Sequence, residues 1–414
     1  MLNGWVLAVV FITVLVSLCN PRGVSDIAFS SSNPPSFSSP FDFSETHHLF
    51  SFLSTLQYDF YRQSCPHAEK IVSSSMALIH SRRQDVSASL LRLFFHDCFI
   101  QGCDASILLD PTTGDDTYSS EKQAIPNLTL KGFVEIDQIK EELERVCPRV
   151  VSCADILSLA TRDAVVLPSV LTEFGIFEAL MRRLPLVFLK STAGGPFYPV
   201  FTGRRDSTRA YFEEAMAELP RPDDNINRTL YLFAARGLDE RDMVSLLGAH
   251  NIGKIGCQFI LNRLYNFSGT SLPDPSIDPE FLNLMRFKCQ EKEHNNTHVS
   301  HDQVSPASSP TPEASVETLR RSTLGMSYFQ ELSPSLSLEG GFDTHYYKSL
   351  LSGRGLLYAD QQLMADENTG RLVKGYASDD GSTFRMDFAR AMVKLSVLDV
   401  LTGSQGQIRE RCGF

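Results

Sequence analysis

Apolar residues recur every three or four positions along several stretches of the chain, with polar residues between them. This spacing places the apolar side chains on one face of a helix and therefore predicts amphipathic α-helices. Strict alternation of apolar and polar residues, which is typical of a half-buried strand, is scarce. We therefore expect a mostly α-helical fold without internal repeats, with loops at breaks rich in Gly, Pro and Asp. The predicted helical segments are residues 68–81, 87–98, 134–147, 153–166 and 383–398.

The N-terminal region does not follow this helical pattern. Residues 6–18 form an apolar run of thirteen residues, which is too short to span a bilayer comfortably and typical of a signal-peptide core. No Lys or Arg precedes the run, so an uncleaved membrane anchor stays an alternative. We interpret residues 1–24 as a signal peptide that directs secretion. Residues 25–55 are rich in Ser, Pro and Phe and are expected to form a flexible extension.

Two segments interrupt the pattern that begins at Leu56. Residues 168–192 are strongly apolar but have no clear place in the core pattern. Residues 291–335 begin with the polar, Ser/Pro-rich run EKEHNNTHVSHDQVSPASS, which predicts a disordered loop. We expect both to be insertions in one domain that spans residues 56–414.

Composition allows a large buried core and argues against nucleic acid as a partner. The chain has 414 residues, of which 43% are hydrophobic, and it carries 38 basic and 49 acidic side chains. The formal net charge of −11 and the lack of a basic cluster do not suit a nucleic-acid backbone. After signal cleavage, no stretch is long and apolar enough to predict a membrane span.

The cysteine content agrees with secretion. Nine cysteines are present, and the first, Cys19, falls in the signal segment. The remaining eight suit four disulfides in an oxidising compartment, although counting alone permits many pairings. A zinc site is the alternative, but no close CxxC pair supports it. Sequons at Asn227, Asn266 and Asn295 also fit a secreted glycoprotein.

The segment RLFFHDCFIQGCDAS, residues 92–106, places charged groups in an apolar setting. In a helix, Arg92 and His96 are four positions apart and share one face. His96 could exchange a proton near neutral pH, and Arg92 could stabilise a developing negative charge. The simpler alternative is a core histidine, a surface arginine and a disulfide-closed loop.

The same segment contains a candidate calcium site. Asp97 points away from the face that carries the basic pair. With Asp104, Ser106 and carbonyls of the intervening turn, it could supply the all-oxygen coordination that Ca²⁺ prefers. Cys98 and Cys103 are close enough in sequence to staple this turn.

A second histidine follows an apolar helical run in DMVSLLGAHNIGKIGC. The run ends at Gly248, so the ring of His250 could be presented from a buried helix to a metal. A ligand histidine needs an acceptor for its other ring nitrogen, and the residues alone do not identify one. A core histidine with satisfied hydrogen bonds is the alternative.

Together, these motifs resemble those of the secreted class III plant haem peroxidases. They occur in the order found in that family and cover most of residues 56–412. The resemblance implies two mostly helical lobes that enclose one b-type haem per chain, in a monomeric protein. The motifs are LQYDFYRQSCPHAEKIV, RLFFHDCFIQGCDASILLD, CPRVVSCADILSLATRDAVV, AGGPFYPVFTGRRDS, LLGAHNIGKIGC, FDTHYYKSLLSGRGLLYADQQL and GSTFRMDFARAMVKLSVLDVLTGSQGQIRERC.

The resemblance assigns residues to the haem. It implies that His250 is the axial iron ligand and that Asp360, in YADQQL, accepts a hydrogen bond from it. Such a carboxylate gives the imidazole partial imidazolate character, which favours oxidised iron. Phe95 is implied to pack over the haem.

On the opposite face, the resemblance assigns the chemistry of hydrogen peroxide. His96 is implied to take a proton from peroxide and pass it to the outer oxygen, while Arg92 stabilises the separating charge. Asn127, in IPN, is implied to keep His96 neutral, so its own sequon should be buried and unmodified. Two phenolic molecules then donate one electron each, and Pro220 matches a family position at the substrate channel.

The resemblance also implies a distal calcium site and four disulfides. The implied calcium ligands are Asp97, the carbonyls of Ile100 and Gly102, Asp104, Ser106, and Glu121 through a water molecule. The implied disulfides are Cys65–Cys147, Cys98–Cys103, Cys153–Cys412 and Cys257–Cys289.

Other features depart from the family pattern. Asn251 stands where the family carries a Thr or Ser ligand of a second, proximal calcium, and Asp343 is the proximal carboxylate that remains. We therefore expect the proximal calcium to be weakly bound or absent. Residues 168–192 fall where the family runs straight on, and a retained intron or a faulty gene model is the plainest explanation. The insertion at 291–335 is expected to be a genuine loop.

The sequence leaves two functions open. An active secreted peroxidase is favoured because all five residues of the implied catalytic and haem-ligand set are present. A catalytically impaired, peroxidase-like protein that binds calcium or the cell wall is the alternative, favoured by the divergent proximal loop and the insertions. Export to the cell wall is preferred over the vacuole because no C-terminal extension follows Phe414.

Overall fold

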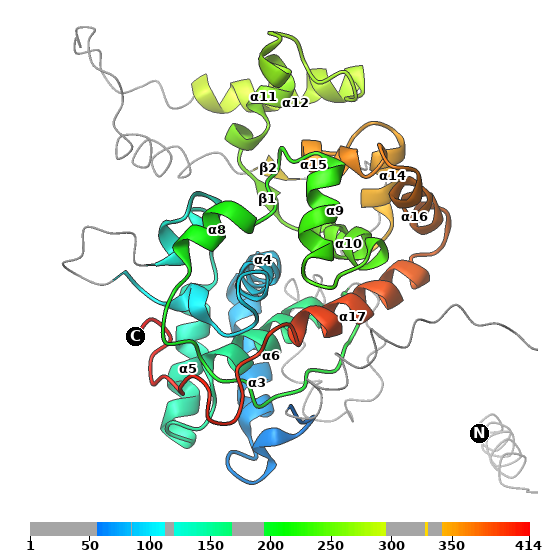
Figure 1. Cartoon of the computed structure of the whole chain (residues 1–414). Helices are drawn as coiled ribbons and strands as arrows, with labels where there is room; N and C mark the ends of the chain where they lie inside the picture. The colour runs from blue at the N-terminus through cyan, green and yellow to red at the C-terminus, as the bar shows by residue number, and fades with distance from the viewer. Residues whose placement is uncertain (1–55, 84, 112–119, 168–193, 295–327, 330–341) are drawn as a thin grey trace, which may run out of the picture. The chain divides into compact units, whose positions relative to one another are not determined.

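The computed structural model is mostly helical, as the periodicity predicts (Figure 1). Within the described residues, the strands are β1 (Lys254–Ile255) and β2 (Tyr328–Phe329), which pair antiparallel. The predicted signal peptide and extension, residues 1–55, lie outside the described part, as does the insertion at 168–192. The structure describes residues 56–83, 85–111, 120–167, 194–294, 328–329 and 342–414.

The five helical segments predicted from the sequence form helices α3, α4, α5, α6 and α17. The helices are α3 (Ala68–Arg82), α4 (Val86–Cys98), α5 (Phe133–Val146), α6 (Cys153–Val166), α8 (Phe212–Glu218), α9 (Ile226–Ala234), α10 (Glu240–Leu247), α11 (Leu261–Tyr265), α12 (Pro279–His294), α14 (His345–Leu351), α15 (Tyr358–Gln362), α16 (Glu367–Ser378) and α17 (Ser382–Ser396). The short 3₁₀ segments used below are η2 (Ser106–Leu108), η3 (Glu121–Gln123), η4 (Ile125–Asn127) and η6 (Gly248–Asn251).

The first group of helices packs around α6. The Ser152 side chain caps this helix by accepting a hydrogen bond from the Asp155 N–H at 3.1 Å. Nearly every residue of α6 is buried, because α3, α4 and α5 all pack against it. Full burial of Ile156 or Leu157 stabilises the fold by about 1.5–3 kcal/mol each. α4 is thereby held with one side in the core.

The second group packs around α10, which contacts α9, α16 and α17. A capping box between Asp239 and Asp242 starts α10, and the helix runs directly into η6. α14 packs on both α16 and η6, and α17 also contacts α4 of the first group. The two groups share one hydrophobic core. Because α17 packs on both α10 and α4, the packing of one core positions both helices.

Four disulfides fasten these elements, and they join the pairs that the resemblance implied. Cys153–Cys412 ties the start of α6 to the C-terminal segment across a sequence separation of 259. Cys65–Cys147 spans 82 residues of sequence. In the chain-entropy picture, closing loops of this length stabilises the fold by roughly 4 kcal/mol or more each.

The insertion predicted at 291–335 differs in part from a disordered loop. The backbone of α12 continues through His294, and Tyr328–Phe329 forms β2 against β1. Glu and Lys are good helix formers, so the helix propagates past Cys289. β2 depends on backbone pairing with a segment more than seventy residues away, which composition does not reveal. The rest of this insertion lies outside the described residues.

Candidate active site

His96 is a buried, neutral imidazole with a fixed tautomer. Its Nδ1 lies 2.6 Å from the Asn127 side-chain oxygen. The amide nitrogen of Asn127 donates to the Glu121 carbonyl at 2.8 Å, which orients the oxygen toward the ring. Burial, with the positive charge of Arg92 second, lowers the pKa of His96 to about 3. Nε2 is therefore an available proton acceptor at physiological pH.

Arg92 lies one helical turn before His96 on α4. Its two terminal nitrogens donate to the Thr129 hydroxyl at 2.9 Å and to the Pro126 carbonyl at 2.8 Å. Arg92 keeps exposed surface, but desolvation by the surrounding protein lowers its pKa to about 10, so the group stays charged at neutral pH. No acidic side chain in the described part of the chain lies within ion-pair distance of it. Its charge is therefore free to act on a bound substrate.

His250 belongs to η6, directly after α10, and pairs with Asp360 of α15. The distance from Nδ1 of the ring to Oδ1 of the carboxylate is 2.7 Å. Asp360 is fully buried, whereas the His250 side chain is 40% exposed, so the ring presents accessible surface away from the carboxylate. Desolvation by the surrounding protein lowers the pKa of the partly exposed His250, but the Asp360 carboxylate outweighs this effect and the net shift is upward.

The two imidazoles come from different helix groups, and the charge of one guanidinium acts on both. The charge of Arg92 lowers the pKa of both His96 and His250, so both rings lie within its electrostatic reach. In each ring Nδ1 is held by an oxygen acceptor, which leaves Nε2 for chemistry. Phe95 on α4 is half-buried and packs on Phe99, with ring centroids 4.7 Å apart.

These residues fit a haem. An exposed imidazole whose Nδ1 is held by a buried carboxylate is the usual arrangement of an iron-ligating histidine. His250 meets this description, and a second, uncoordinated imidazole in reach of the same guanidinium suits chemistry on the other face of the group. The half-buried ring of Phe95 supplies an apolar wall.

The carboxylates expected to bind calcium cluster around the turn after α4. Burial, and then the charges of Asp104 and Glu121, raise the pKa of Asp97 well above its usual range. Burial raises the pKa of Asp104 to about 6 and that of Glu121 to about 7. Buried like charges of this kind are stable only if they are protonated or bind a cation.

Two buried oxygen atoms of this cluster are available as ligands for a cation. The hydroxyl of Ser106 and one oxygen of Glu121 are buried without a hydrogen bond of good geometry in the described part of the chain. The hydroxyl is nevertheless close enough to lower the pKa of both Glu121 and Asp104. No three His, Cys, Asp or Glu side chains within the described ranges gather closely enough to hold a metal by themselves. An ion here therefore depends on the hydroxyl and on backbone carbonyls, which suits calcium.

The turn that carries Ile100 and Gly102 requires its glycine. Gly102 has a φ of +107°, and a Cβ there would lie 2.6 Å from the carbonyl oxygens of Leu398 and Asp399. Its own carbonyl accepts from the Asp104 N–H at 2.9 Å. The disulfide Cys98–Cys103 closes this turn.

The two residues expected at a proximal calcium, Asn251 and Asp343, already have partners within the described part of the chain. The Asn251 amide donates to the Asp343 carbonyl at 2.9 Å and accepts from the Tyr346 N–H at 3.1 Å. One oxygen of the Asp343 carboxylate accepts from the backbone N–H of His345 at 2.8 Å and also pairs with its ring nitrogen. At these two positions, protein groups take the bonds that an ion would need.

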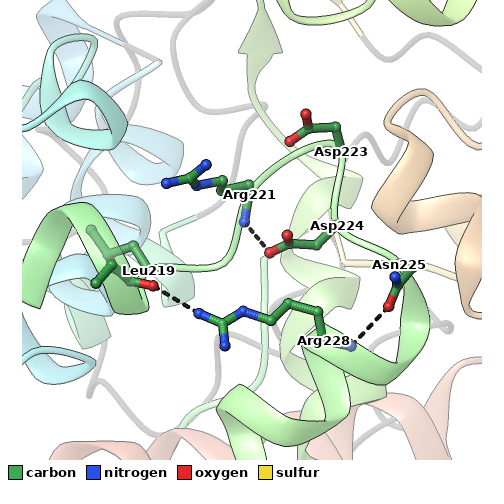
Figure 2. A pocket seen from close by; sticks show the side chains of 7 residues that line it. Leu219, Arg221, Asp223, Asp224, Asn225 and Arg228 are labelled. Atoms are coloured by element: carbon green, nitrogen blue, oxygen red, sulfur yellow. Dashed lines mark hydrogen bonds between the residues drawn. The ribbon is translucent and has the colours of Figure 1, made fainter. Parts of the chain in front are cut away.

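Pro220 stands in sequence between Leu219 and Arg221, which line a polar pocket of about 460 Å³ (Figure 2). The segment around it touches both sides of the site. The Pro222 carbonyl accepts from Ala359 of α15 at 3.0 Å, and the sulfur of Met216 accepts from Ile125 of η4 at 3.2 Å. The pocket is lined by Ala217, Leu219, Arg221, Asp223, Asp224, Asn225 and Arg228.

Two features of this site were not predicted from the sequence. The first is the charged lining of the pocket, since Arg221 and Arg228 belong to no recognisable motif. The second is Tyr346, which lies beside Tyr347 in an apolar segment and would be predicted to be an ordinary core residue. Its hydroxyl nevertheless donates a hydrogen bond to Asp360 at 3.0 Å. No sequence signal separates these two tyrosines.

Comparison with known proteins agrees with this geometry. A family model described as peroxidase matches residues 72–379. Putative Peroxidase 48 of Arabidopsis thaliana is 44% identical over 87% of this chain and 82% of its own length. Peroxidase 28 of the same organism is 38% identical, covering 87% of this chain and 93% of its own.

The chain therefore belongs to the peroxidase family. It is an oxidoreductase that reduces hydrogen peroxide with electrons from a donor, and the family implies a haem cofactor. The expected fold class and the resemblance to plant peroxidases are thus confirmed.

Proposed function

We propose that this protein is a secreted peroxidase with one haem b per chain that oxidises phenolic donors in one-electron steps. The observation that carries the proposal is a pair of imidazoles, each with Nδ1 held by a side-chain oxygen. His96 is neutral with Nδ1 on an amide oxygen, and His250 is exposed with Nδ1 on a buried carboxylate.

Haem, when bound, supplies an iron that holds peroxide and a ring that stores oxidising equivalents. Nε2 of His250 would hold the iron, and Asp360 would keep the Nδ1 proton in place and orient the ring. Phe95 would cover part of the haem face and limit the entry of bulky molecules.

The distal residues move one proton and stabilise one charge. His96 takes a proton from one oxygen of hydrogen peroxide and returns it to the other, so that this oxygen leaves as water when the O–O bond breaks. Arg92 stabilises the negative charge that develops on the departing oxygen. Asn127 keeps the proton of His96 on Nδ1, so that Nε2 can act. Over a cycle, hydrogen peroxide and two phenols give two waters and two phenoxyl radicals.

We place the donor site beside Pro220, because this segment is bonded to both η4 and α15. Distal calcium is proposed at Asp97, Ile100, Gly102, Asp104, Ser106 and Glu121, where it would hold the turn that follows His96. Secretion is supported by the four disulfides and by the apolar N-terminal run. No helix in the described ranges has the length and apolar character of a membrane span.

The test is a haem-loaded preparation of the mature chain. We expect a Soret band and peroxide-dependent oxidation of guaiacol, and we expect His96→Ala to keep the band while losing turnover. A haem-loaded protein that bound calcium but oxidised no donor would instead support the non-catalytic alternative.

A further inference from the structure

Asp360 accepts hydrogen bonds from three donors, and two of them share one oxygen. Nδ1 of His250 lies 2.7 Å from Oδ1, and the hydroxyl of Tyr346 lies 3.0 Å from the same atom. The second oxygen accepts from the Leu357 N–H at 3.0 Å. Asp360 has no exposed surface, so these protein donors replace the water that would otherwise solvate it.

The direction of the tyrosine bond follows from its partner. An ionised carboxylate only accepts hydrogen bonds, so the Tyr346 hydroxyl must donate. Tyr346 is itself fully buried, and its ring packs edge-on against Tyr347 with centroids 5.1 Å apart. The ring therefore has little freedom to turn the hydroxyl elsewhere.

The backbone of Tyr346 is held by the residue that follows His250. The Asn251 side-chain oxygen accepts from the Tyr346 N–H at 3.1 Å, and its amide nitrogen donates to the Asp343 carbonyl at 2.9 Å. η6 and the start of α14 are thus joined twice: through Asn251 on the backbone and through Asp360 on the side chains. The position of the phenol relative to the His250 ring is set by these bonds.

Two donors on one carboxylate oxygen compete for its negative charge. A hydrogen bond from Tyr346 makes Oδ1 a weaker acceptor for the Nδ1 proton of His250. A weaker acceptor leaves less imidazolate character on the ring, and outer hydrogen bonds of this kind adjust the electron density that a histidine gives to a metal.

We propose that Tyr346 is a positioning residue that limits how strongly Asp360 draws the proton from His250. It thereby limits how strongly His250 donates electrons to bound iron. The proposal rests on the axial role of His250 proposed above.

The test compares Tyr346→Phe with Tyr347→Phe in the haem-loaded protein. Tyr347 is the matched control because it is adjacent, equally buried, and donates to the Val244 carbonyl at 3.1 Å rather than to Asp360. For Tyr346→Phe we expect the iron–imidazole stretching band of the ferrous form to shift to higher frequency and the iron midpoint potential to fall. For Tyr347→Phe both should stay at the wild-type values.

A second variant covers the case in which Tyr346→Phe does not fold. Site-specific 3-fluorotyrosine at position 346 keeps the shape of the ring and makes the hydroxyl a stronger donor, so the same band should shift to lower frequency. Equal spectra for the two phenylalanine variants, or no shift with fluorotyrosine, would overturn the proposal. A wild-type protein without any iron–imidazole band would show instead that the axial assignment of His250 is wrong.

Discussion

The loop after His96, on the distal side, and the loop after His250, on the proximal side, differ in how their buried polar groups find partners. Beside His96, burial raises the pKa values of Asp97, Asp104 and Glu121, and the charge of Asp104 adds to the rise for the other two. The hydroxyl of Ser106 there lacks a good hydrogen-bond partner in the described part of the chain. Beside His250, the Asn251 amide makes two hydrogen bonds to the backbone, and Asp343 is paired with His345. We therefore expect a cation to stabilise the distal loop, whereas the described residues of the proximal loop are joined by hydrogen bonds within the protein.

From this difference we infer that an ion would hold the distal loop, whereas a neutral amide holds the proximal one. A buried charge is stable only beside a charge of opposite sign, whereas a buried amide is stable once it has a hydrogen-bond donor and an acceptor within reach. The four predictions below compare the two sides, from the largest expected effect to the smallest.

Replacing each histidine by alanine should separate catalysis from haem retention. We expect His96→Ala to lose roughly 100- to 10,000-fold of peroxide-dependent turnover, because a positioned general acid–base contributes about that much. The Soret band should remain. His250→Ala should instead lose the haem, which absorption after gel filtration would show. Retention of most turnover by His96→Ala would contradict its role.

Removing calcium should destabilise the distal side of the protein alone. After chelation we expect a loss of several kcal/mol of unfolding free energy, since an ion at about 1,000 times its dissociation constant contributes roughly 4 kcal/mol. Elemental analysis of the folded protein should find one tightly bound calcium per chain. Two such ions would contradict our interpretation of Asn251.

Stabilisation by calcium should increase with pH. Burial raises the pKa of Asp104 to about 6 and of Glu121 to about 7, above the values of an unfolded chain. Their contribution to stability is therefore full below about pH 4 and lost as pH rises through 6 and 7 in the ion-free protein, on the order of 3 kcal/mol per group.

Calcium replaces the protons, so the difference in melting temperature with and without the ion should grow between pH 5 and pH 8. The lowered pKa of His96 acts in the opposite sense, with stability lost as pH falls below its ordinary value, but it is common to both states and cancels. A difference that does not change with pH would show that these carboxylates do not bind the ion.

Asn251→Ala should destabilise the proximal loop without any dependence on calcium. It leaves the Tyr346 N–H and the Asp343 carbonyl without their partner, which costs about 1–3 kcal/mol. Asn262→Ala, on the exposed face of α11, is the control and should change the unfolding free energy by less than about 0.5 kcal/mol. If calcium restored the stability of Asn251→Ala, an ion would occupy this loop after all.

The helices and several site residues could be predicted because their signals are local. Apolar spacing within a single segment predicted α3 to α6 and α17, and Arg92 and His96 share a face because of helix geometry alone. Family motifs named Asn127, His250 and Asp360. Periodicity, by contrast, could not show that α12 continues through His294 or that Tyr328 pairs with Ile255.

By itself, the sequence determined which segments are helical, which residue types are available, and the family to which the chain is similar. Tertiary structure decided which oxygen each histidine nitrogen meets, since His250 and Asp360 are 110 positions apart. It also decided that Tyr346 rather than Tyr347 reaches this carboxylate, and that the Asn251 amide closes the proximal loop. The physical reason is that helix formation depends on neighbours in sequence, whereas these hydrogen bonds depend on how distant helices pack.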